Sequence, residues 1–294
     1  MGVILLDRSN DALNINPPIG NFHLVVHGSD WLWAVTAIYC LFLVIVIGLA
    51  YFAKSGEKIF HYLLTISLLT GAVSYFAMAS DLGNVAVPTT DNDAGLRQIF
   101  YARYINWFIG WTPMILAVGL VSGVSWATIV YNIALSWAWV SIWLAGALTP
   151  TTYKWGFFTF GLLAYFLLSA SLLHTGTITS KRLSITRHYT GLAGYLVFFW
   201  MLYPIAWGVD DGGNDISVTS GFIFFGILDL FTVPFLSLAI LFLANTWDYR
   251  TLNLYFTQYG RVPQGSDLPE RIQQEKAAEA EAQASAPAAP AETV

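Results

Sequence analysis

The chain has 294 residues, of which 56% are hydrophobic and 11% are charged, with a net charge of −5 and a mean hydropathy of +0.59. A typical soluble domain has about 25% charged residues, and a soluble core of this size cannot bury so much apolar surface. The composition therefore excludes a soluble enzyme, a nucleic-acid binder and a disordered scaffold.

Seven apolar windows follow a mixed segment, expected to be extracellular, over residues 1–30. Each is 19 to 27 residues long, enough to cross a hydrocarbon core of about 30 Å as a helix. Lipid offers the backbone no hydrogen-bond partners, so helices are expected. The predicted fold class is an all-α membrane protein, a seven-transmembrane-helix bundle over residues 31–250. The windows are 31–53, 60–80, 102–122, 125–148, 155–174, 191–209 and 219–245.

The connections indicate how the bundle is oriented. With the N-terminus outside, the inner connections and tail hold nine Lys and Arg residues, against four on the outside. The positive-inside rule therefore predicts an outside N-terminus and a cytosolic C-terminus. Segment 81–100 is polar and is expected to form a small external hairpin. The cytosolic tail, 251–294, becomes rich in Ala, Glu, Gln and Pro from about residue 263, which predicts disorder there.

Ionisable residues inside a membrane span are costly and indicate functional sites. Arg103 lies near the start of the third window and Asp229 in the middle of the seventh, while Asp81, Asp210 and Asp211 lie at window ends. Charge balance predicts a buried ion pair between Arg103 and Asp229. In the alternative, Arg103 reaches the outer interface and Asp229 is protonated.

Motifs for catalysis are missing. The five His residues fall at window ends or in loops, so no metal site is expected. There is no Gly-rich phosphate loop and no nucleophilic Ser motif. Asp229 has no second carboxylate at its depth to form an acid–base pair. We therefore expect that the chain is not an enzyme.

Several motifs carry a family resemblance. They are YARYINW at 101–107, GALT at 146–149, YKWG at 153–156, WMLYPIAW at 200–207 and LDLFTVP at 228–234. These stretches resemble those of the microbial (type 1) rhodopsins, especially the fungal branch, over roughly residues 25–260. The resemblance implies the seven-helix fold of that family.

The sequence departs from this family where retinal chemistry takes place. The resemblance implies a Schiff-base Lys four residues after Asp229, on the same helix face, but that residue is Val233. All five Lys residues lie in predicted loops or the tail. Where the family usually has the counterion Asp, this chain has Asn106. Where the family usually has the cytoplasmic proton donor, this chain has Val118. No covalent cofactor is therefore expected; non-covalent retinal is the disfavoured alternative. Losing the Schiff base and the second carboxylate together leaves Arg103 and Asp229 balanced one to one.

The resemblance also implies a vestigial retinal pocket. Its matching residues are Tyr75, Tyr104, Trp107, Trp139, Trp200, Tyr203 and Trp207. They form either a retained cavity for an apolar ligand or a filled aromatic core, and the filled core is favoured because Trp139 is larger than the family's frequent Met. Pro113 is the seventh residue after Asn106, whereas in the family the Pro is usually the sixth after the counterion Asp. This predicts either a one-residue bulge in the third span or a shifted register that puts Trp107 at the counterion position.

The group that this chain resembles is the fungal opsin-related proteins without the retinal Lys, which include heat-shock-induced yeast membrane proteins. The resemblance implies a stress-linked, multi-pass plasma-membrane protein that is chaperone-like or regulates the plasma-membrane proton ATPase. Expected partners are the lipid bilayer, that ATPase and further copies of the chain, with no nucleic acid. A light-driven pump or photosensor is disfavoured. A passive transporter, an apolar-ligand receptor and an interaction protein acting through its lipid-facing surface or tail stay open.

Overall fold

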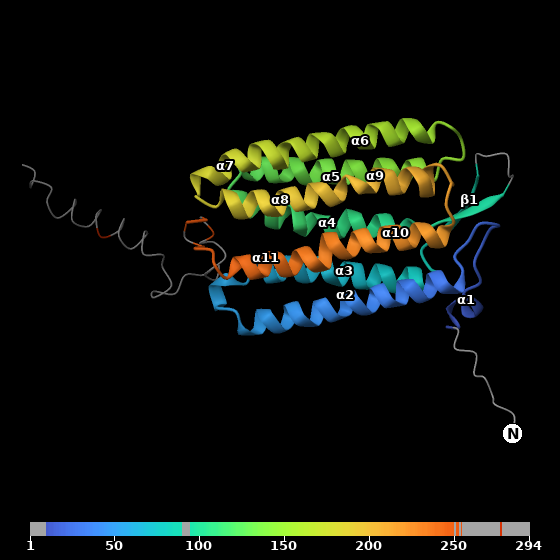
Figure 1. The fold of residues 1–294 in the computed structure, drawn as a ribbon, viewed down its shortest axis with the longest axis horizontal. Coiled ribbons are helices and arrows are strands. Elements are labelled where there is room, and N and C mark those ends of the chain that lie inside the picture. The colour runs from blue at the N-terminus through green and yellow to red at the C-terminus, as the bar shows by residue number, and fades with distance from the viewer. Residues whose placement is uncertain (1–9, 90–94, 250, 253, 255–276, 278–294) are drawn as a thin grey trace, which may run out of the picture.

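The computed structural model describes residues 10–89, 95–249, 251, 252, 254 and 277. Within these residues, seven helical spans run side by side as one bundle (Figure 1). Their lengths and hydropathy suit a membrane crossing, so the fold class predicted from the sequence is confirmed. The outside N-terminus and cytosolic C-terminus stay predictions. The predicted disordered tail lies outside the described residues, apart from residue 277.

Four spans are single α-helices: α2 Val26–Phe52, α3 Ile59–Ala79, α4 Tyr101–Ser122 and α5 Trp126–Ala147. The other three each contain a π-helical segment, whose wider turn holds an extra residue and rotates the side chains beyond it. The fifth span comprises α6 Lys154–Ala170, η2 Ser171–Thr175 and α7 Gly176–Arg182. The sixth comprises α8 Thr186–Trp200, α9 Leu202–Trp207 and η3 Gly208–Gly212, and the seventh α10 Val218–Leu230, η4 Phe231–Phe235 and α11 Leu236–Ala244.

Three of the helical spans extend further than the apolar windows predict. The first span begins at Val26 rather than residue 31, and the fifth runs on to Arg182 rather than 174. Hydropathy marks the apolar part of a helix, whereas the helix itself continues until its backbone is capped. Between the third and fourth spans, Gly123 takes a left-handed φ of +68° and the Ser125 hydroxyl accepts from the Thr128 N–H. These two features make that connection short.

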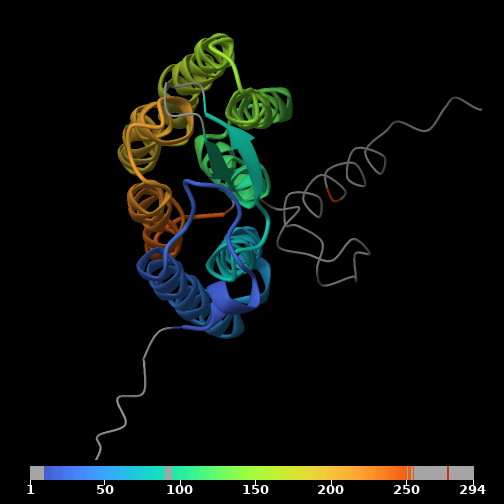
Figure 2. The ribbon, with the colours of Figure 1, turned by 90° about the vertical axis from the view of Figure 1, so that its right-hand side faces the viewer.

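A small hairpin covers one end of the bundle. Strands β1 Val85–Pro88 and β2 Leu96–Ile99 pair antiparallel, which confirms the hairpin expected within 81–100. The Gln98 N–H donates to the Phe22 carbonyl at 2.9 Å, so the segment before α2, which includes the short helix α1 Ala12–Ile15, is attached to this hairpin. Figure 2 views the bundle from this side. We call this the hairpin end, and the opposite end, where α11 stops, the tail end; the 3₁₀ turn η1 Ser55–Glu57 lies there, between α2 and α3.

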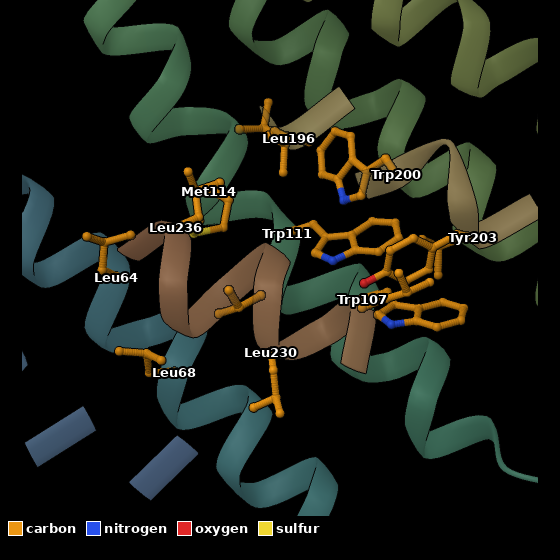
Figure 3. Packing of buried hydrophobic residues seen from close by; sticks show 14 of the residues in the cluster. Leu64, Leu68, Trp107, Trp111, Met114, Leu196, Trp200, Tyr203, Leu230 and Leu236 are labelled. Carbon is orange, nitrogen blue, oxygen red and sulfur yellow. The ribbon is translucent and has the colours of Figure 1, made fainter. Parts of the chain in front are cut away.

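Aromatic side chains fill the centre of the bundle. Consecutive spans pack against one another, and α10 also packs against α2. The largest fully buried side chains are Trp107, Trp111, Trp139, Trp143, Trp200 and Trp207. Figure 3 shows Trp107 and Trp111 of α4 beside Trp200 and Tyr203 of the sixth span. These large rings therefore come from three different spans, the third, fourth and sixth.

Candidate functional site

Asp229 lies on α10 and is completely buried. Its carboxylate accepts hydrogen bonds from the hydroxyls of Tyr75 and Tyr203, both at 2.6 Å, from the Trp107 indole at 2.9 Å and from the Asn106 amide at 3.4 Å. These donors come from α3, α4 and α9. Four donors satisfy both carboxylate oxygens without a cation in contact.

Tyr39, which the sequence did not single out, completes this arrangement. Its hydroxyl donates to the Asp229 carbonyl at 3.1 Å, and its ring stacks on Tyr75 with centroids 5.3 Å apart. Gly71 on α3 leaves room for this ring, because a Cβ there would lie 2.1 Å from Tyr39. The backbone and the side chain of Asp229 are thus both held by tyrosines.

The predicted ion pair between Arg103 and Asp229 is wrong. The Arg103 guanidinium contacts Asp210 at 2.9 Å and Asp211 at 3.4 Å instead. Both aspartates lie in η3, the last turn of the sixth span, and both are buried. Because η3 brings two carboxylates inward close to Arg103, the cation pairs there and not with Asp229.

Arg97 on β2 makes this a cluster of four charges. Its guanidinium lies 2.5 Å from Asp210, and its side chain is only 3% exposed. Two arginines thus face two aspartates, which satisfies the requirement that buried charges be paired. Arg97 was expected in an external loop. The signal that could have found the cluster was two adjacent acids, Asp210 and Asp211, ending one span while Arg97 precedes another span and Arg103 lies in its first turn.

Tyr104 and Trp207, expected to line a pocket, belong to this charge cluster. The Tyr104 hydroxyl donates to Asp211, and the Trp207 indole donates to the Tyr104 oxygen at 2.8 Å. The rings of Phe222 and Phe225 lie 4.5 and 4.4 Å from the Arg103 guanidinium carbon, within cation–π range. The cluster is therefore closed off by aromatic rings.

Four more of the predicted pocket residues pack around a residue that was missed, Trp111. Its ring centroid lies 5.1 Å from those of Trp139, Trp200 and Tyr203, and 5.5 Å from that of Trp107. Centroid separations of about 4.5–7 Å are those of packed aromatic pairs. Trp111 therefore lies between the rings that the resemblance assigns to retinal, as Figure 3 shows, which favours the filled core over the retained cavity.

The third span has no π-bulge. Helix α4 is α-helical throughout Tyr101–Ser122 and includes Pro113. Of the two candidates for the counterion position, Trp107 makes the shorter bond to Asp229, and Asn106 also reaches it. Neither side chain is an acid, so whichever of the two occupies the counterion position, it supplies no second carboxylate beside Asp229.

Val233 lies in η4 and is 3% exposed. Of the Lys residues, Lys54 and Lys181 are exposed, Lys58 lies between η1 and α3, and Lys154 begins α6 at the hairpin end. Lys276 is outside the described residues. Among the described residues, no lysine amine lies at the depth of Val233 in the middle of a span. In the same residues, no group of three His, Cys, Asp or Glu side chains is arranged to hold a metal ion.

A separate acid, Asp81, lies just beyond α3 at the hairpin end. It takes a left-handed φ of +56°, and its carboxylate accepts from the Gln98 amide at 2.7 Å. The side-chain amide oxygen of Gln98, Oε1, in turn accepts from the Leu24 N–H at 2.9 Å. Burial raises the pKa of Asp81 to about 6, although the bond from Gln98 and the nearby His23 act in the opposite direction.

Known proteins match most of this chain. The family model described as bacteriorhodopsin-like protein matches residues 27–247. Protein FDD123 of Trametes versicolor is 41% identical over 252 residues, covering 85% of this chain and 89% of that protein. The 30 kDa heat shock protein of Saccharomyces cerevisiae is 32% identical over 250 residues, covering 75% and 74%. The crystal structure of a light-driven proton pump from Leptosphaeria maculans has a TM-score of 0.73 and 26% identity, covering 79% of this chain and 98% of that one.

Proposed function

The chain belongs to the bacteriorhodopsin-like family, and on that premise we propose that it is an opsin-related membrane protein that works without photochemistry. The observation that carries the proposal is Val233, four residues after Asp229 at the position of the Schiff-base lysine. A Schiff base needs a primary amine, which valine lacks.

The surroundings of Asp229 support the same proposal. A pumping opsin balances its buried carboxylates with a protonated Schiff base and an arginine. Here Arg103 is paired with Asp210 and Asp211, and Asp229 is held by neutral donors. Asn106 supplies an amide where a second carboxylate would add an unpaired charge. The site is therefore suited to a core without a chromophore.

The packing of Trp111 is a further, independent argument. Its ring contacts Trp139, Trp200 and Tyr203, which leaves little room between them for a polyene. A non-covalent retinal would have to displace this ring. This packing argues against retinal as a cofactor.

A direct test is the absorption spectrum of the purified protein after incubation with all-trans retinal. We expect no visible band red of free retinal. Treatment with borohydride, which reduces Schiff bases, should leave no retinyl group on the protein. A red-shifted band in the unsubstituted protein would contradict the proposal.

The cellular role that we propose is a stress-linked one at the plasma membrane, as a chaperone-like regulator of the proton ATPase. The stress link is supported by the identity of 32% with a yeast 30 kDa heat shock protein, and the role at the ATPase is what the resemblance to the fungal opsin-related proteins implies. The test is to reconstitute a fungal plasma-membrane proton ATPase with and without this protein and to measure ATP hydrolysis and proton transport before and after a heat step. A change in either rate that depends on this protein supports the role, and identical rates in both preparations would contradict it.

A further inference from the structure

A polar pocket opens at the tail end of the bundle, between the turn that joins α7 to α8 and the residues that follow α11. Its volume is about 240 Å³, below the range of about 300–1,000 Å³ of sites that enclose a whole drug-sized ligand. The volume therefore suits a small group rather than a large ligand. Six of its ten lining residues are polar or charged: Ser184, Arg187, His188, Thr246, Asp248 and Thr251.

Two buried aromatic residues hold the segment after α11 in place as one wall of this pocket. The Trp247 indole donates to His188 Nδ1 at 3.0 Å. An indole nitrogen can only donate, so Nδ1 accepts and the neutral imidazole carries its proton on Nε2. The Tyr249 hydroxyl donates to the Glu57 carbonyl at 3.1 Å. This wall is thus bonded both to α8 and to the turn between α2 and α3.

The pocket and its rim carry charges of both signs. Arg187 of α8 belongs to the lining, and Lys181 and Arg182 form the end of α7 directly before the turn. All three are exposed, and none of them forms an ion pair with another described residue. Asp248, from the segment after α11, accepts from the Thr251 hydroxyl at 2.7 Å. Three cations thus surround one carboxylate, so the surroundings attract a ligand with net negative charge that also carries a cationic group.

The pocket lies at the depth of lipid headgroups. The fifth span ends at Arg182, the sixth begins at Thr186 and the seventh ends at Ala244. The sixth and seventh spans have 27 residues each, which is about 40 Å of helix and matches the thickness of about 40–45 Å of a bilayer with its headgroups. The pocket therefore opens level with the headgroups. This is the end that the positive-inside rule predicts to be cytosolic, and the cytoplasmic leaflet contains the anionic lipids.

Arg187 also begins the exposed face of α8. Gly191, Gly194 and Phe198 follow it at intervals of four, three and four residues, which places them on the same side of the helix. A Cβ on either glycine would have no other atom within 4 Å, and Phe198 is 54% exposed. The pocket therefore adjoins a helix face along which the hydrocarbon chains of a lipid have room to lie.

We propose that this pocket binds the headgroup of phosphatidylserine. Its phosphate and carboxylate lie at Arg187 and the two cations that end α7, its ammonium lies at Asp248, and its acyl chains run along the glycine face of α8. Phosphatidylglycerol has the same net charge but no ammonium, and phosphatidylethanolamine has the ammonium but no net charge. The pocket contains no residue that contacts the Asp229 side chain, so the proposal is independent of the function proposed above.

The test places the full chain in phosphatidylcholine nanodiscs with equal small amounts of phosphatidylserine, phosphatidylglycerol and phosphatidylethanolamine, and measures by mass spectrometry which lipids stay bound after extraction. We expect phosphatidylserine to be retained about fivefold more than phosphatidylglycerol, the factor that one hydrogen-bonded contact supplies, and phosphatidylethanolamine to be retained least. Arg187→Gln should retain about fivefold less phosphatidylserine, since one basic residue near anionic lipid contributes that factor. Asp248→Asn should still retain phosphatidylglycerol but lose the preference for phosphatidylserine.

The matched control is Lys54→Gln, which removes one exposed positive charge at the same end, outside this pocket, and should retain phosphatidylserine as the parent does. Size-exclusion chromatography and circular dichroism establish that each variant is folded. Equal retention of phosphatidylserine and phosphatidylglycerol by the parent would overturn the proposal, as would an unchanged preference in Asp248→Asn. Equal losses in Arg187→Gln and Lys54→Gln would also overturn it, because they would show a general attraction to the basic end. Glycerophosphoserine, which has no acyl chains, should not displace the lipid at equal concentration; displacement would overturn the assignment to a lipid.

Discussion

Arg97 on the hairpin and Asp210 at the end of the sixth span form a buried ion pair with an N···O distance of 2.5 Å. The pair joins a strand outside the bundle to a helix within it. Arg103 of α4 contacts the other oxygen of the same carboxylate. The hairpin is therefore fastened to the bundle by charge, in addition to its hydrogen bonds with the segment before α2.

Replacing Arg97 with Gln should destabilise the protein strongly. Breaking a buried pair by removing one partner costs about 3–5 kcal/mol, because the other charge is left uncompensated. The free energy of unfolding in detergent, measured against Lys54→Gln, checks this; Lys54 contacts Glu57 but is 83% exposed, so its loss should cost at most about 1 kcal/mol. Adding Asp210→Asn to Arg97→Gln should cost less than the sum of the two single changes. Additive costs would show that the pair is not coupled.

The hydrogen bonds to Asp229 predict that two Tyr→Phe variants differ in their free energy of unfolding. Tyr203→Phe removes a donor to a buried carboxylate and should cost about 1.5–3 kcal/mol, the range for hydrogen bonds to charged groups. Tyr165→Phe is the matched control, because its hydroxyl donates to the neutral carbonyl of Val197 at 3.2 Å and its loss should cost about 0.5–1.5 kcal/mol. Thermal or denaturant unfolding in detergent measures both. Equal losses would mean that Asp229 does not depend on this donor.

Asn106→Asp should be destabilising on its own and less destabilising when it is combined with Val233→Lys. A second carboxylate next to Asp229 adds like charge in a buried site, and we expect a cost of about 1–3 kcal/mol. Val233→Lys supplies a cation that can balance it. The unfolding free energies of the two single variants and the double variant form a cycle that measures this coupling. A double variant as unstable as the sum of the singles would refute the charge-balance argument.

Asp81 makes stability depend on pH. Burial raises its pKa in the folded protein to about 6, above the ordinary value of 3.8. The folded state therefore holds a proton that the unfolded state has already released between about pH 4 and pH 6, so stability falls as pH rises through this window. Relative to Asp81→Asn, the unfolding midpoint of the parent should decrease from pH 4 to pH 6 and then level off. A constant difference, or one that grows with pH, would contradict this assignment.

The spans could be predicted from the sequence, because the length of an apolar run is a local property and every helix that crosses a bilayer needs a long one. Sequence reasoning also found Asn106, Trp107 and Tyr203 beside Asp229, because the motifs that carry the family resemblance include them, but it missed Tyr39. It gave Arg103 the wrong partner, because charge balance alone cannot choose among Asp210, Asp211 and Asp229. That choice depends on the π-helical end of the sixth span, which hydropathy does not reveal.

Trp111 shows a different limit. The sequence offered seven aromatic positions by resemblance, but Trp111 had no counterpart among them. Its importance comes from its packing against Trp139, Trp200 and Tyr203, three residues far away in the chain. The sequence shows the extra residue between Asn106 and Pro113. It does not show in which direction α4 points the ring of Trp111.

Whether the core of this protein can still hold retinal is measured by absorption spectra after incubation with all-trans retinal, for Val233→Lys and for Val233→Lys combined with Trp111→Thr. In the parent protein an amine is missing at position 233, and Trp111 occupies the space between the remaining pocket rings. We therefore expect the single variant to stay colourless and the double variant to develop a red-shifted band that borohydride bleaches. A strong red-shifted band in Val233→Lys alone would show that the cavity is open, and would contradict the filled core.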